Sequence, residues 1–208
     1  ARQLVDGAMD MPADVMSRIY TQFDASRIMQ DAWALDADAD RRKGPLAGLM
    51  VSIKDLFDEA GQVTSAGSAI LRDSAPAQSD APVVARLKAA GVVPCGRTTM
   101  SEFAYSGVGL NPHTGNPGNA RDPARISGGS SSGGALSVAL GLADVALGTD
   151  TGGSVRIPAA LNGLAGFKPT QATVPLEGAF PLSQSFDSIG PLAKDIATCA
   201  AFHAVLSG

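Results

Sequence analysis

The sequence is poor in the residues that build metal sites and disulfide frameworks. Its 208 residues include only two cysteines, Cys95 and Cys199, and two histidines, His113 and His203. Two isolated cysteines cannot form a disulfide framework or a Cys-x-x-Cys metal site. A zinc site would need all four of these distant side chains in one place, so we predict no metal site. Both histidines are expected to be structural or surface residues.

The sequence also lacks a basic cluster and a long hydrophobic run. It holds 16 Lys and Arg against 20 Asp and Glu, and its one short basic run, residues 41–43, follows an aspartate-rich stretch. Nucleic-acid binding therefore has no electrostatic footprint. The longest near-apolar stretch, residues 135–147, contains Asp144 and is too short to span a bilayer. Aspartates also interrupt the N-terminal residues, which argues against a signal peptide. We expect a soluble, cytoplasmic protein without membrane contact.

Apolar residues make up 45% of the chain, enough to bury the core of a single domain over residues 1–208. Residues 12–35 have apolar side chains at helical spacing after Pro12, which predicts one helix. The residues up to 95 then predict a loop over 36–43, a strand over 49–53, a loop over 61–80, a helix over 81–90 that Asp80 caps and Gly91 closes, and a strand over 92–95. This alternation predicts an α/β fold, a mixed twisted sheet covered by helices.

Glycine is abundant, and it clusters in two places. The chain has 24 glycines. Residues 107–129 show no periodic pattern, and a structureless stretch of this length inside a domain is usually functional. It leads into a Gly/Ser loop at 128–134. A helix over 135–142 and a strand over 144–147 follow, and then a second glycine-rich turn at 148–154.

These two loops admit several interpretations. Gly and Ser are common turn residues, so both loops could be ordinary turns. Glycine-rich loops also bind phosphate through backbone N–H groups, but neither loop matches the P-loop or the dinucleotide fingerprint. Residues 129–133 fit the G-x-S-x-G nucleophile elbow, with Ser131 as nucleophile and Asp187 and His203 as its partners. An elbow must follow a buried strand, however, and the preceding segment is polar and broken by two prolines.

A further interpretation uses a lysine as the base. Serine needs a partner that takes its proton, and lysine is available where histidines are scarce. Lys54 ends the apolar run 49–53, and burial there would favour its neutral form. The alternative for Lys54 alone is a snorkelling or salt-bridged side chain beside Asp55. Glycines in the turn 151–154 would let backbone N–H groups approach an oxyanion.

At this point the sequence resembles a known family. Gly-Gly-Ser-Ser-Ser-Gly at 128–133, followed by Gly-Thr-Asp-Thr-Gly-Gly-Ser-Val-Arg-Ile-Pro-Ala at 148–159, is similar to the signature of the amidase signature family. The segments that end at Lys54–Asp55 and that span 96–104 and 166–170 resemble further family segments. The resemblance covers residues 44–195.

The resemblance implies a Ser-cisSer-Lys triad and roles for eight residues. Ser154 matches the nucleophile, Ser130 the bridging serine with a cis peptide bond, and Lys54 the base. Thr151, Gly152 and Gly153, with Ser154, match the oxyanion-hole backbone. Asp150 and Arg156 are expected to pair and to support this turn. Ser131 and Ser132 are weaker candidates for supporting hydrogen bonds.

The implied reaction is hydrolysis of a carboxamide to a carboxylic acid and ammonia or an amine through an acyl-enzyme, without metal or organic cofactor. The expected ligand is a small-molecule amide, and the resemblance is compatible with a homodimer. The alternative is the amidase component of a multi-chain amidotransferase, or a non-catalytic homologue that binds a partner. Met50 and Ser127 stand where the family often has proline. Family catalytic domains are about twice as long, so we expect the N-terminal part of a longer catalytic domain.

Overall fold

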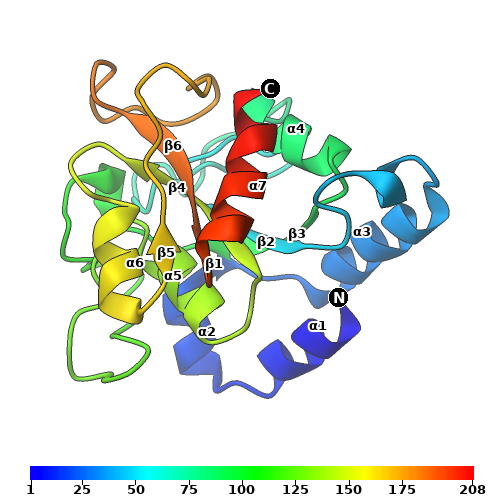
Figure 1. Cartoon of the computed structure of the whole chain (residues 1–208). Coiled ribbons are helices and arrows are strands. Elements are labelled where there is room, and N and C mark those ends of the chain that lie inside the picture. The colour runs from blue at the N-terminus through cyan, green and yellow to red at the C-terminus, as the bar shows by residue number, and fades with distance from the viewer.

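A six-stranded mixed sheet runs through the centre of the molecule in a computed structural model that describes residues 1–208 (Figure 1). The strands are β1 (Tyr20–Gln22), β2 (Met50–Lys54), β3 (Val93–Thr98), β4 (Val145–Asp150), β5 (Ala165–Gly166) and β6 (Ser188–Ala193). They lie in the order β1-β3-β2-β4-β6-β5. Strands β3, β2 and β4 are parallel, and the outer pairs are antiparallel. Strand β2 therefore lies between two parallel neighbours.

Helices cover both faces of this sheet. They are α1 (Arg2–Met9), α2 (Ala13–Ile19), α3 (Ala25–Ala37), α4 (Pro82–Ala89), α5 (Ser132–Ala139), α6 (Arg156–Asn162) and α7 (Ile196–Ser207), with short 3-10 helices η1 (Arg41–Lys43) and η2 (Glu102–Ala104). Helices α4 and α7 share one apolar cluster with Val51 of β2 and Leu147 of β4. Helices α1, α3, α5 and α6 share the other with Cys95 and Ala146. Alternate strand residues thus face opposite helical layers, and the predicted α/β fold is confirmed.

The single helix predicted over residues 12–35 is wrong. Helix α2 ends at Ile19, and residues 20–22 form strand β1, which pairs antiparallel with β3. A new helix starts at residue 25 because the Asp24 carboxylate accepts hydrogen bonds from the N–H groups of Ser26 and Arg27. The apolar spacing is preserved across the break, but pairing with the sheet edge prevails over the local helical pattern.

The predicted helix over 81–90 is α4, but Asp80 does not cap it. The N-cap residue is Ala81, and no side chain caps the helix. The Asp80 carboxylate instead accepts from the N–H of Ala60 and from Lys88 Nζ. Gly91 follows the helix with a φ of 91°, in the left-handed region that glycine tolerates, so its closing role is confirmed.

The remaining predicted elements are present with shifted bounds. The strands predicted over 49–53, 92–95 and 144–147 are β2, β3 and β4, and the helix predicted over 135–142 is α5. Residues 107–129 hold no helix or strand, as predicted. Helix α1 and the elements from α6 to α7 were not predicted. No helix of the structure is both long and apolar enough to cross a membrane.

Candidate active site

Lys54 lies at the carboxyl end of the central strand β2, and all five residues of that strand are buried. Its Nζ lies 2.7 Å from Ser130 Oγ and 2.8 Å from Thr149 Oγ1. Strand β4 runs parallel to β2, with Leu147 opposite Ile53, so the ends of both strands reach the same sheet edge. This is the edge at which open α/β sheets place their ligands.

Burial changes the chemistry of Lys54. The side chain is fully buried, and desolvation lowers its pKa from 10.5 to about 7, against the attraction of Asp150 and Asp187, which raises it. The ammonium form costs free energy in a low-dielectric environment. A substantial share of Lys54 is therefore neutral near pH 7, and a neutral amine can accept a proton from the adjacent Ser130 hydroxyl.

Ser130 lies in the loop that enters helix α5, and the Gly129–Ser130 peptide bond is cis, in agreement with the resemblance. The Ser130 carbonyl accepts a hydrogen bond from the N–H of Ser101 at 3.2 Å. A Cβ at Gly133 would lie 2.2 Å from the Ile19 carbonyl oxygen, so only glycine allows this close approach. Gly133, in the first turn of α5, thus lets this helix lie close to the end of α2.

Ser154 lies in the turn that follows β4. The residue is 7% exposed. Its one hydrogen bond within the protein is made by its carbonyl and not by its hydroxyl. The N–H of Ser131 donates to the Ser154 carbonyl at 3.2 Å, so the two glycine-serine loops contact each other directly. The structure therefore brings together the two loops that stand out in the sequence, with Lys54 bonded to one of them.

Asp150 and Arg156 form the expected pair. Arg156 Nε and Nη2 each donate to the Asp150 carboxylate at 2.9 Å, and the N–H groups of Gly153, Val155 and Arg156 also donate to it. Burial raises the pKa of Asp150, but these hydrogen bonds outweigh it and hold the pKa below its ordinary value. A buried, ionised carboxylate thus organises the whole turn.

The backbone N–H groups of the turn differ in availability. The Gly153 N–H donates to Asp150 Oδ1 at 2.7 Å, and the φ of Gly153 is 127°. The N–H groups of Thr151, Gly152 and Ser154 donate no hydrogen bond within the protein. Three of the four backbone groups that the resemblance implied for an oxyanion are therefore free, while Gly153 has its N–H engaged.

Thr149 was not predicted as a site residue, the side-chain contact of Thr151 was not predicted either, and Asp187 has partners other than the predicted ones. Thr149 bonds to Lys54, and Thr151 Oγ1 donates to Asp187 Oδ1 at 2.5 Å. Thr149, Thr151 and Asp187 line a cavity of about 230 Å³ whose other walls include Ala104 and residues 176–182. The position of Thr149 two residues beyond the apolar core of β4 was the only sequence feature that could have indicated it.

The nucleophile-elbow interpretation is not supported by the structure. Ser131 Oγ lies 3.5 Å from the Thr149 carbonyl oxygen, a long contact. His203 lies in α7 and packs edge-on against the Phe167 ring at 5.0 Å. Asp187 bonds to Thr151 and to the N–H groups of Leu182 and Ser183. The three residues of that interpretation thus have separate partners. No group of three or more His, Cys, Asp or Glu side chains gathers to hold a metal ion.

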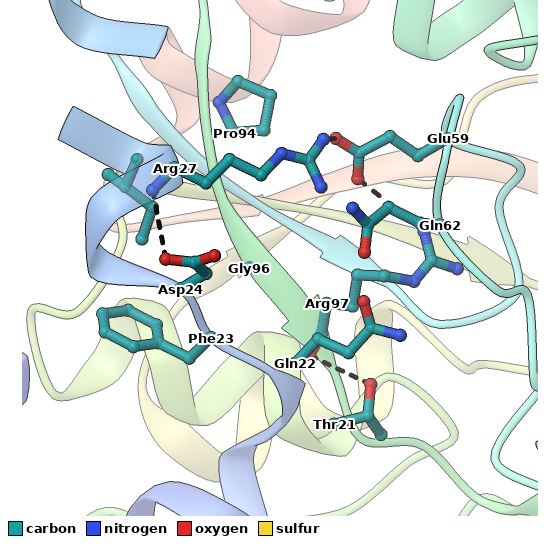
Figure 2. Close-up of a pocket in the computed structure, with 11 residues that line it drawn as sticks. Thr21, Gln22, Phe23, Asp24, Arg27, Glu59, Gln62, Pro94, Gly96 and Arg97 are labelled. Atoms are coloured by element: carbon teal, nitrogen blue, oxygen red, sulfur yellow. Dashed lines mark hydrogen bonds and ion pairs between the residues drawn. The ribbon is translucent and has the colours of Figure 1, made fainter. Parts of the chain in front are cut away.

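A second, more polar pocket lies beside β1 and the start of α3 (Figure 2). It has a volume of about 390 Å³ and, like the cavity beside Thr149, is not lined by Lys54, Ser130 or Ser154. Arg27 reaches across it and bonds to Glu59 at 2.5 Å. The buried Arg97 also borders this pocket, near the point where β3 ends. Thr149, which bonds to Lys54, lines the other cavity and not this pocket. Arg97 nevertheless connects the wall of this pocket to Asp55, the residue after Lys54.

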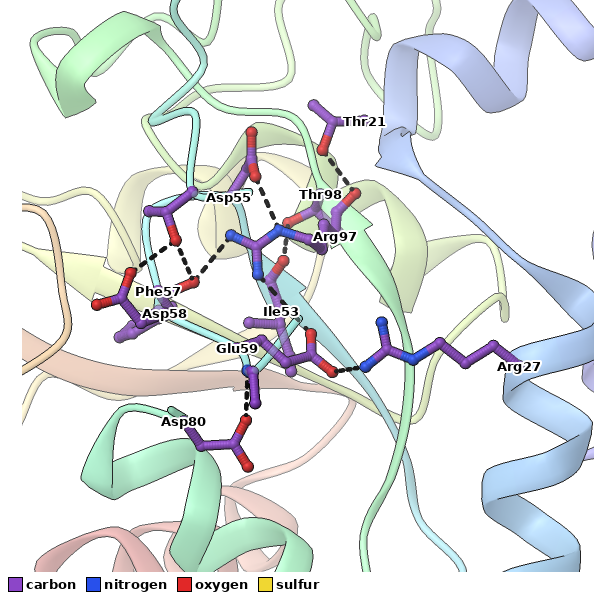
Figure 3. A network of polar contacts seen from close by, with 12 residues as sticks. Thr21, Arg27, Ile53, Asp55, Phe57, Asp58, Glu59, Asp80, Arg97 and Thr98 are labelled. Atoms are coloured by element: carbon purple, nitrogen blue, oxygen red, sulfur yellow. Dashed lines mark hydrogen bonds and ion pairs between the residues drawn. The ribbon is translucent and has the colours of Figure 1, made fainter. Parts of the chain in front are cut away.

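That connection is a charged network around Arg97 (Figure 3). Arg97 is 1% exposed and donates through Nε to Asp55 Oδ1 at 2.9 Å and through Nη2 to the Phe57 carbonyl at 2.8 Å. Its Nη1 lies 3.7 Å from Glu59 Oε2. Arg97 therefore holds the segment immediately after Lys54 against β3. Asp55 thus pairs with Arg97 and not with Lys54, contrary to the alternative interpretation of Lys54.

We expect Arg97→Met to lower the free energy of unfolding by about 3–5 kcal/mol, because it leaves the buried Asp55 carboxylate without a cation, whereas Glu59 keeps Arg27 and Lys88. Urea unfolding at neutral pH measures this. Arg125→Met is the matched control, because the Arg125–Asp122 pair is largely exposed and is worth less than about 1 kcal/mol. Equal small losses in both variants would show that the Arg97 network does not stabilise the fold.

Comparisons with known proteins identify the family. The amidase family model matches residues 15–208. The chain is 47% identical over 163 residues to Amidase 1 of Oryza sativa, covering 78% of this chain and 38% of that protein. It is 41% identical over 205 residues to a glutamyl-tRNA(Gln) amidotransferase subunit of Burkholderia pseudomallei, covering 98% of this chain and 40% of that one.

A solved structure is similar as well. The native peptide amidase of Stenotrophomonas maltophilia matches with a TM-score of 0.88 at 34% identity, over 99% of this chain and 44% of that one. The chain thus spans less than half the length of these relatives. The family match extends over almost all of the sequence, including both glycine-serine loops and Lys54. The chain therefore belongs to the amidase family.

Proposed function

We propose that this chain provides the catalytic groups of an amidase that hydrolyses a linear carboxamide to a carboxylic acid and ammonia or an amine. The observation that carries the proposal is the 2.7 Å contact between the fully buried Lys54 Nζ and Ser130 Oγ. Burial brings the lysine pKa to about 7, so the amine can act as a base at neutral pH. The contact between Ser131 and Ser154 adds support, because it holds the second serine loop against the first.

In the proposed reaction, neutral Lys54 takes the proton of Ser130, and Ser130 takes the proton of Ser154. Ser154 Oγ then bonds to the carbonyl carbon of the amide. As the tetrahedral intermediate collapses, the C–N bond breaks and the leaving nitrogen receives the proton back from Lys54 through Ser130. Water repeats the sequence on the acyl-enzyme, which releases the acid and restores the Ser154 hydroxyl.

The developing oxyanion needs N–H donors that are not already engaged. We assign this role to the N–H groups of Thr151, Gly152 and Ser154, which have no acceptor within the protein. Gly153 contributes differently: its N–H bonds to Asp150, and its positive φ turns the chain so that its neighbours can face the substrate. The Asp150–Arg156 pair keeps this geometry.

The substrate is proposed to enter the cavity lined by Thr149 and Thr151, which suits a small amide. The length of the relatives supports residues 1–208 as one structural unit of a longer catalytic domain. The remaining part of such a domain would complete the walls of the cavity.

Labelling with a fluorophosphonate tests the proposal, because the reagent modifies only an activated serine. We expect the full-length protein to carry one adduct, and tandem mass spectrometry should place it on Ser154. Labelling should be prevented by prior denaturation, which is the control for non-specific modification. An adduct on Ser131 would instead favour the nucleophile elbow, and folded protein without any adduct would contradict an activated serine.

The second candidate function is that of the amidase component of a multi-chain amidotransferase. The 41% identity to the amidotransferase subunit of Burkholderia pseudomallei supports it. The chemistry at Ser154 would be the same, but a partner chain would be required. Hydrolysis of a simple amide by the purified single protein favours the free amidase. Labelling of Ser154 without hydrolysis, together with co-purification of a second chain, favours the multi-chain enzyme.

A further inference from the structure

Asp187 lies just before β6, and its carboxylate accepts three hydrogen bonds. It is 7% exposed. Its Oδ1 accepts from Thr151 Oγ1 at 2.5 Å, and its Oδ2 accepts from the N–H groups of Leu182 and Ser183 at 3.0 and 2.9 Å. Both oxygens are therefore occupied by donors from two separate segments. One segment is the turn that holds Ser154, and the other borders the cavity beside Thr149.

The Thr151 contact matters because the turn is otherwise anchored at its far end. Asp150 binds the N–H groups of residues 153, 155 and 156, but none of Thr151 or Gly152. Gly152 is exposed and has no Cβ to pack against the protein. The Thr151 side chain is thus the contact that restrains the first part of the turn, where two of the free N–H groups lie.

We propose that Asp187 is a positioning residue of the active site, which ties the oxyanion turn at Thr151 to the cavity wall formed by residues 182–187. This inference rests on the proposed function of that turn. Asp187 does not touch the reacting atoms. It acts through Thr151, whose orientation it fixes by accepting the hydroxyl hydrogen, and through the loop whose two N–H groups it accepts.

The charge of Asp187 gives this role a distinctive readout. The charged groups that act on Lys54 are Asp150, at the end of β4, and Asp187; both raise the pKa of Lys54 against the larger effect of burial. Asp55, the next residue in the chain, is paired with Arg97. Removing the charge of Asp187 must lower the Lys54 pKa further. Activity that needs neutral Lys54 then extends to lower pH.

Asp187→Asn tests both the positioning of the turn and the effect of the Asp187 charge on Lys54. An amide has one acceptor oxygen, so it cannot accept from Thr151 and from the two N–H groups together. In the full-length protein we expect the acid limb of kcat/KM to move to lower pH by about one unit, while the maximum falls. We also expect faster hydrogen exchange at the Gly153 N–H, because a turn released at Thr151 opens more often and breaks the hydrogen bond from Gly153 to Asp150.

Two further variants separate position from charge. Thr151→Val removes the hydroxyl at nearly constant shape, so it should lower kcat/KM and speed exchange at Gly153 without moving the acid limb. Asp195→Asn removes an equal charge and the cap of α7, where Asp195 accepts from the N–H and hydroxyl of Thr198. It should leave both the acid limb and Gly153 exchange unchanged.

The outcomes distinguish this inference from the proposed function. If Asp187→Asn is folded but leaves the exchange at Gly153 unchanged, Asp187 does not position the turn. A fall in activity without movement of the acid limb would also contradict the charge effect. If the wild-type protein neither labels nor hydrolyses, the proposed function fails, and hydrogen exchange still decides whether Asp187 holds the turn.

Discussion

Replacing Ser154 with alanine is expected to lower kcat for amide hydrolysis by at least about 10⁴-fold. The physical reason is that no other hydroxyl can take its place. Ser130 is bonded to Lys54, and Ser131 Oγ faces the Thr149 carbonyl. The Ser154 hydroxyl makes no hydrogen bond within the protein, so we expect its removal to leave the fold intact. Steady-state kinetics on a small amide measures the effect.

Ser131→Ala is the matched control for this variant. It makes the same change in a neighbouring buried serine whose only side-chain hydrogen bond is long. We expect its kcat to stay within about tenfold of the wild type, because it would lose a supporting contact and not the nucleophile. Comparable activity of Ser154→Ala and the wild type would remove Ser154 from the mechanism and leave the lysine-serine contact without a catalytic role.

Replacing Lys54 with methionine is expected to lower kcat/KM by about 10²–10⁴-fold, the usual contribution of a general base. The wild-type rate should rise with pH through about 7, because the amine must be neutral to accept a proton and burial lowers its pKa to about that value. Below this pH the ammonium form dominates and the rate falls. Lys54→Met should lose this limb, so its residual activity should vary little with pH near 7.

Methionine keeps most of the volume of the lysine stem, so packing in the core should change little. The hydroxyls of Ser130 and Thr149 nevertheless lose a buried partner, so circular dichroism must first establish that the variant is folded. Lys194→Met, at an exposed position, is the control for the loss of one positive charge. A pH profile for Lys54→Met with the wild-type acid limb would show that a different group sets that limb.

Local patterns predicted some elements correctly, and distant partners account for the errors. The strands around Lys54 were predicted because apolar runs bounded by turn residues are local patterns. Gly91 was assigned correctly because a left-handed residue after a helix is also a local requirement. The break between α2 and α3 was missed because the residues of β1 pair with Thr98 and Arg97, which lie far along the chain. Asp80 was assigned wrongly because its partners lie on different elements.

By itself, the sequence determined the α/β class, the two glycine-serine loops and the family to which the chain belongs, because periodicity, turn residues and motifs are local properties. Tertiary structure alone decided which groups meet at the strand ends. Thr149 and Asp187 join the site through contacts between distant segments. The basicity of Lys54 depends on its complete burial between the helical layers. Desolvation and through-space charge act on atoms that folding brings together, and neither is encoded in the spacing of residues along the chain.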